Sequence, residues 1–254
     1  VRRRSRARQE ACFLGPVAPH PRLVAFSLGV LVLACIAAPA AGRVLPGDAF
    51  LCGDVTVPRA TRGAAPPPTF HARVAVPVID RFTRPLPSGR YTLDLRRADS
   101  FCRPVRIDEA ELTAPLHALE RYEARRTRRK PAPPPLPHVT EVVETAFGTV
   151  RLKLGSIATL AVPTLATGSV GGGGAAERDH FACYAGRPER TTGPRLRPFR
   201  TVVQTVAGAR AVDVRKPIGL CVPASVREDD PSAPKHPVDL LCWDARLVPD
   251  DDAP

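Results

Sequence analysis

The sequence Asp179-His-Phe-Ala-Cys-Tyr184, followed later by Leu220-Cys-Val-Pro223, frames a segment that occurs in degenerate form elsewhere in the chain. We call the first motif the opening and the second motif the closing. The residues at the cysteine positions of the other copies are Cys52, Arg121 and Cys242 in openings and Cys102 and Ala161 in closings. The middle copy therefore lacks both of its cysteines together. Recurrence of several features in the same order indicates an internal repeat.

Apolar and polar residues alternate between each opening and its closing. Val142-Val-Glu-Thr145 and Val202-Val-Gln-Thr205 each lead to a glycine, and alternation then resumes, as in Val150-Arg-Leu-Lys-Leu154. Such alternation, rich in β-branched residues, predicts half-buried strands. One window, Asp108 to Arg129, has helical character, but its opening motif predicts a strand in its middle. We therefore expect an all-β fold of tandem small antiparallel β modules, with three degenerate repeats and a terminal half-repeat strand.

The repeat also sets the expected domain boundaries. The segments are a signal peptide or N-terminal membrane anchor (1–41), β repeat 1 (44–112), β repeat 2 without its cysteines (116–170), a Gly-rich linker (171–178), β repeat 3 (179–235), and a terminal half-repeat strand with an acidic tail (236–254). A last strand without its own module is expected to pair with the open edge of the preceding copy.

The N-terminal segment has the composition of an export signal. Several arginines precede the apolar run Leu23 to Ala38, which leads into the small residues Ala40 and Ala41. A basic region, an apolar region and a small-residue site are typical of a cleaved secretory signal. Two alternatives stay open, an uncleaved membrane anchor and a lipoprotein modified at Cys35. In each case the protein is exported to the periplasm, the cell surface or the exterior, and it is membrane-anchored if the segment is retained.

Export favours disulfides as the state of the cysteines. Pairing each opening cysteine with its own closing cysteine gives Cys52–Cys102 and Cys183–Cys221, and leaves Cys242 without a partner. The alternative joins a closing to the next opening, gives only Cys221–Cys242, and leaves three thiols unpaired. Because free thiols are a liability in an oxidising compartment, we favour the first scheme.

No motif in the chain carries a recognisable chemistry. Cys242 has no histidine and acidic partner in a protease-like setting, and His180-x-x-Cys183 lacks the second half of a zinc site. The glycines 171–174 do not have the spacing of a phosphate-binding loop. We therefore assign no catalytic residue, cofactor or metal ligand and expect a non-catalytic protein.

The chain carries a net charge of +12, and 33 of its 37 basic residues are arginines. The codon usage of a GC-rich genome explains part of this excess, which weakens an inference of nucleic-acid binding. The densest basic cluster consists of Arg121, Arg125, Arg126, Arg128, Arg129 and Lys130. It is interpreted either as a solvated loop or as a contact with an anionic partner, such as a cell-envelope polymer or lipid headgroups. Export and the scarcity of aromatics disfavour nucleic acid, and we expect a monomer.

The H-F-x-C-Y opening, the V-V-x-T-x-x-G strand and the L-C-x-P closing resemble an exported repeat domain of GC-rich bacteria, described as a domain of unknown function. The resemblance is strongest over Asp179 to Leu247 and implies location rather than chemistry. It suggests a structural or binding protein of the bacterial cell envelope or exterior. The alternatives are a membrane-tethered binding protein and an exported enzyme or accessory subunit with a site between modules.

Overall fold

The fold is all-β, as the sequence predicted. A computed structural model describes residues 9–16, 48–55, 71–84, 86, 90–107, 117–130, 139–145, 148–165, 179–189 and 197–249. These residues form eleven strands, all members of one antiparallel sheet, and one short 3₁₀ helix. The apolar run 23–38, Cys35 and the linker 171–178 lie outside the described residues.

The strands differ greatly in length, from six to nineteen residues. They are β1 (Gln9–Pro16), β2 (Asp48–Asp54), β3 (Arg73–Asp80), β4 (Tyr91–Ile107), β5 (His117–Arg126), β6 (Thr140–Thr145), β7 (Gly148–Leu165), β8 (His180–Pro188), β9 (Phe199–Thr205), β10 (Gly208–Val226) and β11 (Val238–Leu247), with the 3₁₀ helix η2 (Ala233–Lys235) before β11.

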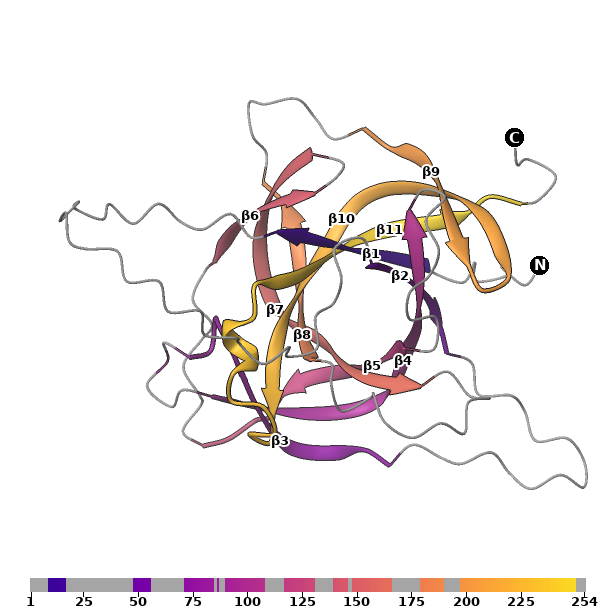
Figure 1. The fold of residues 1–254 in the computed structure, drawn as a ribbon. Coiled ribbons are helices and arrows are strands. Elements are labelled where there is room, and N and C mark those ends of the chain that lie inside the picture. Colours follow the sequence, from indigo (N-terminus) through magenta and orange to yellow (C-terminus); the bar gives the residue numbers. More distant parts are fainter. Residues whose placement is uncertain are drawn as a thin grey trace, which may run out of the picture.

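Eight of these strands close into a ring. Each pairs antiparallel with two neighbours in the order β1, β2, β4, β5, β7, β8, β10, β11 and back to β1. Figure 1 shows the strands curving around one another, with β1 beside β11 and β2. Strands β3 and β9 each join β4 to β10, and β6 pairs with β7. All the expected modules thus contribute to a single sheet, and the tandem repeat itself stays a prediction.

Strand β1 closes the ring between the two ends of the chain. As predicted, the terminal strand β11 pairs with β10, and it also pairs with β1. The sequence assigned residues 1–41 to a signal peptide or anchor, but β1 lies within this range. Ala11, Cys12 and Phe13 are almost fully buried. This part of the segment therefore belongs to the core of the fold. Within the described residues we find no helix with the length and apolarity that a membrane crossing requires.

The glycine of the V-V-x-T-x-x-G motif forms the turn of a hairpin. In the β6–β7 hairpin the Thr145 hydroxyl donates to the Gly148 carbonyl, and in the β9–β10 hairpin Thr205 donates to Gly208 in the same way, at 2.9 and 2.8 Å. Both glycines have φ near +110°, a conformation that strongly favours glycine. The motif therefore marks the start of each long strand that follows.

The strands β4, β7 and β10 are long because each pairs with two different sets of strands along its length. Their first halves form hairpins with β3, β6 and β9, and their second halves belong to the ring. Each has a register shift between these halves, after Leu95, Leu154 and Val214 respectively. A bulge inserts an extra residue and bends a strand. The bends thus allow one strand to leave the hairpin and enter the ring.

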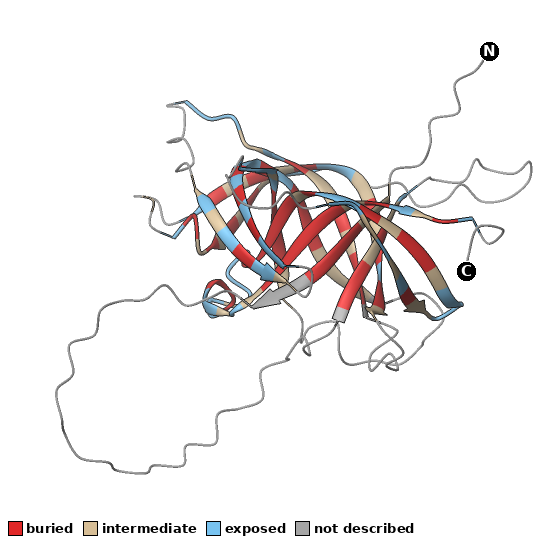
Figure 2. Ribbon diagram, turned by 90° about the horizontal axis from the view of Figure 1, so that it is seen from above, coloured by how far each residue is buried: buried red, intermediate tan, exposed pale blue. Residues whose placement is uncertain are grey.

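Two core clusters occupy opposite faces of the sheet. On β11, Leu240 and Cys242 belong to the smaller cluster, whereas Leu241 and Trp243 belong to the larger one. Successive side chains of a strand point to opposite faces, so this alternation separates the clusters. Figure 2 shows the buried residues along the middle of the ring strands and exposed residues near their ends.

A buried polar network fastens the turn after β3 to two ring strands. Asp80 is fully buried, and its carboxylate accepts hydrogen bonds from the Thr83 amide and from the Tyr184 hydroxyl, the latter at 2.6 Å. Burial raises the pKa of Asp80, and these hydrogen bonds oppose that effect. Next to it, Arg81 pairs with the buried Asp239 at 2.7 Å, and burial raises the pKa of Asp239 to about 7. The network ties the turn to β8 and β11.

Strands β8 and β10 approach so closely at Gly219 that only glycine fits. A Cβ at this position would lie 2.6 Å from the backbone oxygen of Tyr184. At Gly53, on β2, a Cβ would meet no atom within 4 Å. The two glycines therefore form a matched pair for testing the packing of the ring.

We predict that Gly219→Ala lowers the free energy of unfolding by about 1–3 kcal/mol, because the strands must move apart to accept the methyl group. Gly53→Ala should change it by no more than about 0.5 kcal/mol. Urea unfolding of the oxidised proteins, followed by tryptophan fluorescence, measures both. Equal midpoints for the two variants would contradict the close approach of β8 and β10.

Candidate functional site

The inner face of the ring carries the residues that the repeat singled out. Arg121 on β5 forms an ion pair with Glu10 on β1, and strands β2 and β4 separate these two strands in the ring. Side chains from strands that are not neighbours can meet only across the inside of the ring. Glu10 lies directly opposite Cys52, which lies opposite Cys102, so these cysteines share the inner face.

Three disulfides lie on this face. The structure contains Cys52–Cys102 and Cys183–Cys221, the two bridges that the sequence predicted. It also contains Cys12–Cys242, which the sequence analysis missed. The chain-entropy relation gives an upper-end stabilisation of about 4 kcal/mol for each shorter loop and about 5 kcal/mol for the loop closed by Cys12–Cys242. The disulfides thus contribute a large part of the free energy of unfolding that is typical of a domain of this size.

The sequence around Cys12 contains a signal for the missed bridge, but the composition of the N-terminal segment obscured this signal. Cys12 stands in Ala11-Cys-Phe13, an apolar stretch like the closing motif, but flanking arginines and the later apolar run favoured a leader. The second signal was Cys242, which the preferred pairing scheme left alone. The structure resolves its state, because β1 supplies the closing half that the last opening lacked.

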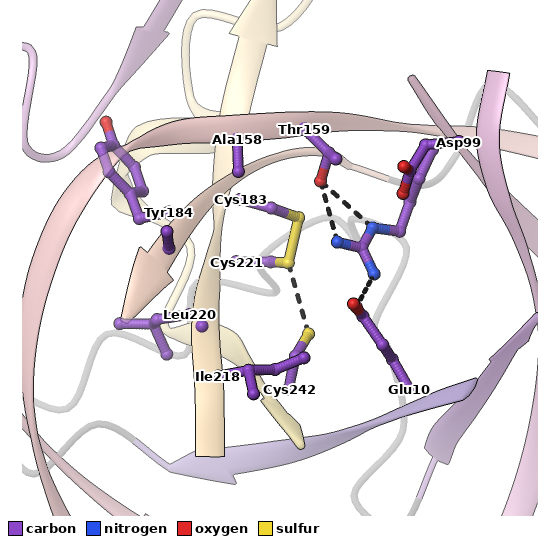
Figure 3. A pocket seen from close by; sticks show the side chains of 13 residues that line it. Glu10, Asp99, Ala158, Thr159, Cys183, Tyr184, Ile218, Leu220, Cys221 and Cys242 are labelled. Carbon is purple, nitrogen blue, oxygen red and sulfur yellow. Dashed lines mark hydrogen bonds and ion pairs between the residues drawn. A yellow bond between two sulfur atoms is a disulfide. The ribbon is translucent and has the colours of Figure 1, made fainter. Parts of the chain in front are cut away.

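Arg121 occupies an opening position without a cysteine, and Ala161 lies directly opposite it on β7. The Arg121 side chain is 9% exposed, and its Nε and Nη2 donate to the Thr159 hydroxyl at 3.1 and 3.0 Å, while Nη1 donates to Glu10. Dashed lines in Figure 3 mark these contacts. An ion pair and a hydrogen-bonded hydroxyl therefore stand where the other three positions have a disulfide.

The Arg121–Glu10 pair is costly to break from one side. With the Glu10 side chain only 15% exposed, removing the guanidinium would leave a largely buried carboxylate without its cation. Loss of one partner of a buried pair typically costs about 3–5 kcal/mol. The pair therefore contributes to the stability of the ring.

The predicted basic cluster is divided by the fold. Arg121 turns inward, so it does not belong to a surface cluster. Of the other five members, Arg125, Arg128, Arg129 and Lys130 are exposed, and Arg126 is half-buried with its guanidinium over the Tyr91 ring. Arg125 also pairs with Glu123 at 3.2 Å. The exposed residues remain candidates for contact with an anionic partner.

A cavity of about 220 Å³ opens on the inner face beside these groups. Its lining combines charged and polar side chains with sulfur and apolar atoms, and consists of Glu10, Asp99, Arg121, Ala158, Thr159, Cys183, Tyr184, Ala185, Ile218, Gly219, Leu220, Cys221 and Cys242. Figure 3 shows the Cys183–Cys221 bridge, Cys242 and Glu10 directed toward the same space. Ala158 and Ala185 are exposed, so this part of the lining faces solvent.

A separate cluster of acidic and imidazole groups lies near the start of β8. Atoms of Asp179, Asp230 and His236 come within 4.8 Å of one another, close enough to hold a metal ion. Their polar atoms already bond within the protein: His236 Nδ1 pairs with Asp179 at 2.8 Å, and Asp230 accepts from Ser232. Burial raises the pKa of Asp179, and His236 opposes that effect. These contacts account for the cluster as a link between β8 and the loop before β11.

Comparison with known proteins adds no family to these observations. No family model matches the chain. No curated protein and no solved structure matches it either. The resemblance to an exported repeat domain therefore stays a prediction from the motifs.

We predict that the position held by Arg121 and Ala161 accepts a fourth disulfide, because its register is that of the bridged positions. In a Glu10→Gln background, which removes the buried carboxylate, the added pair R121C and A161C should oxidise to a bridge. The bridge should raise the free energy of unfolding by about 2–4 kcal/mol relative to the same protein with that bridge absent. Peptide mapping without reduction detects the link.

The matched control carries E10Q and R121C alone and cannot form the bridge. A triple variant in which both introduced thiols alkylate freely after oxidation would show that the two side chains do not face each other.

Proposed function

We propose that the chain is an exported, non-catalytic binding protein of the bacterial cell envelope or exterior, whose ring holds a cavity for a small molecule. The observation that carries this proposal is the inner face itself. Two disulfides and one ion pair contribute to the walls of a cavity whose lining offers both polar and apolar contacts. A pre-formed cavity is the usual setting for small-molecule binding.

Export is supported by the state of the cysteines. Each of the six cysteines among the described residues is in a disulfide. Disulfides form and persist in oxidising compartments and are rare in the cytosol. The basic and apolar pattern of residues 1–41 supports the same location, although β1 gives part of that segment a second role.

The cavity favours a small ligand with an acceptor oxygen. At about 220 Å³ it is smaller than the roughly 300–1,000 Å³ of pockets for drug-sized ligands. Arg121 has N–H groups beyond those bonded to Thr159 and Glu10, and Ile218 supplies apolar surface. A small carboxylic acid matches both features, since a guanidinium binds carboxylates with directional hydrogen bonds.

The lining supports binding rather than catalysis. Among the described residues that line the cavity there is no histidine, and the three cysteines are held in disulfides. Nucleophilic catalysis by cysteine needs a free thiolate, which a cysteine held in a disulfide does not offer. Exposed Arg125, Arg128, Arg129 and Lys130 would place the molecule against an anionic envelope polymer or lipid headgroups.

Cell fractionation tests the location. The full chain with a C-terminal epitope, expressed in a GC-rich bacterial host, should be found in the envelope or the culture fluid with its disulfides formed. N-terminal sequencing of this material shows whether β1 and Cys12 are retained. Cytoplasmic protein with freely alkylated thiols would overturn the proposed location.

Ligand-observed NMR tests the cavity, with monocarboxylates from acetate to benzoate as probes. We expect at least one of them to bind the oxidised wild-type chain. Ala158→Trp, at the exposed part of the lining, should weaken that binding at least tenfold, because the indole fills the entrance. Val206→Trp, on an exposed turn outside the lining, should leave it unchanged. If no probe binds, or if the two variants bind alike, the cavity is not a binding site for this class.

A further inference from the structure

Two of the three disulfides touch each other. Cys221 Sγ lies 3.6 Å from Cys242 Sγ, although each belongs to a different bridge. The dashed line between them in Figure 3 marks this contact. Both residues line the cavity, and both are about 2% exposed. The two bridges therefore share a contact between sulfur atoms at a place that small molecules can reach through the cavity.

From this geometry we propose that the Cys183–Cys221 and Cys12–Cys242 bridges form a thiol–disulfide exchange site that responds to a low-molecular-weight thiol. A disulfide rearranges when a thiolate attacks one of its sulfur atoms. A thiolate at Cys242 would lie next to Cys221 Sγ without any movement across the ring. This activity is independent of the binding function proposed above.

The exchange balances in two stages. In the first, two equivalents of a small thiol reduce Cys12–Cys242: one thiolate forms a mixed disulfide, the second resolves it, and the thiol leaves as its own disulfide. In the second, the Cys242 thiolate attacks Cys221 Sγ. The Cys221–Cys242 bond forms as the Cys183–Cys221 bond breaks, and the electron pair leaves on Cys183, which takes up a proton. The second stage involves no net oxidation or reduction.

The exchange changes how the ring is closed. Strands β10 and β11 pair with each other, with Gly219 opposite Cys242 and Cys221 opposite Leu240. A Cys221–Cys242 bridge therefore links two strands that are consecutive along the ring, and β1 loses its covalent bond to β11. Since Glu10 lies on β1, the partner of Arg121 is then held in place by the backbone pairing of β1 with β2 and β11 and by side-chain contacts alone.

Removal of β1 by proteolytic processing would produce the same starting point. The processed chain would lack Cys12, and Cys242 would then be a thiol beside the Cys183–Cys221 bridge. The exchange would proceed without an added reductant. It would give a mixture of molecules with a Cys183–Cys221 bridge and molecules with a Cys221–Cys242 bridge.

Cys12→Ser reproduces this state in the full chain. After oxidative folding and alkylation with iodoacetamide, non-reducing peptide mapping should find both Cys183–Cys221 and Cys221–Cys242 links, with Cys183 and Cys242 each partly alkylated. The control is Cys52→Ser, which leaves Cys102 as a thiol; among the described residues no sulfur atom of a second bridge is in contact with Cys102. Apart from Cys35, which is present in every variant, the control should alkylate only at Cys102. A C12S protein in which Cys242 is fully alkylated and Cys183 is not alkylated would overturn the proposal.

A second pair of variants guards against a folding defect. C12S/C183S and C12S/C221S lack the same two bridges, but only the first keeps the two sulfur atoms that touch. The first should form a Cys221–Cys242 bridge on oxidation, whereas the second should keep Cys183 and Cys242 as thiols. Equal alkylation in both variants, with Cys52–Cys102 intact in both, would exclude an exchange site at this contact.

Discussion

The pairing of β1 with β11 joins the two ends of the chain, and the ring depends on it. Without this pairing β11 and β1 would each present an open edge, and strand edges expose unpaired backbone groups to water and to other chains. The same contact places Cys12 beside Cys242 and brings Glu10 to the inner face. One pair of strands therefore supplies the last backbone ladder, the longest covalent loop and the anion that compensates Arg121.

The inner face combines covalent and ionic links at equivalent places. Disulfides occupy three of the positions where an opening strand meets a closing strand, and Arg121 with Ala161 occupies the fourth. A small residue opposite a long one leaves space, and the arginine crosses that space to reach Glu10. The absence of a fourth bridge thus allows the charged pair that polarises the cavity.

Alternation and motif spacing predicted much of this fold. The pattern Val150-Arg-Leu-Lys-Leu154 forms a strand with alternating burial, and the cysteine frame gave two of the three bridges. The local signal at Cys12 was too weak to predict the role of β1, because its partner lies 230 residues away and its flanks have the composition of a leader. For the same reason the Arg121–Glu10 pair and the cavity had no local signal. Long-range closure decides these features, and a sequence pattern reports mainly local ones.

The three disulfides all join neighbouring strands, whereas the pair between Arg121 and Glu10 spans the interior. The ring therefore resists displacement of neighbouring strands along its circumference more strongly than it resists changes in its diameter. Sliding of one strand along the next is opposed by covalent bonds. Among the described residues, the Arg121–Glu10 contact and side-chain packing oppose flattening of the ring. Changes in the width of the cavity are consequently the softest deformation available to this face of the molecule.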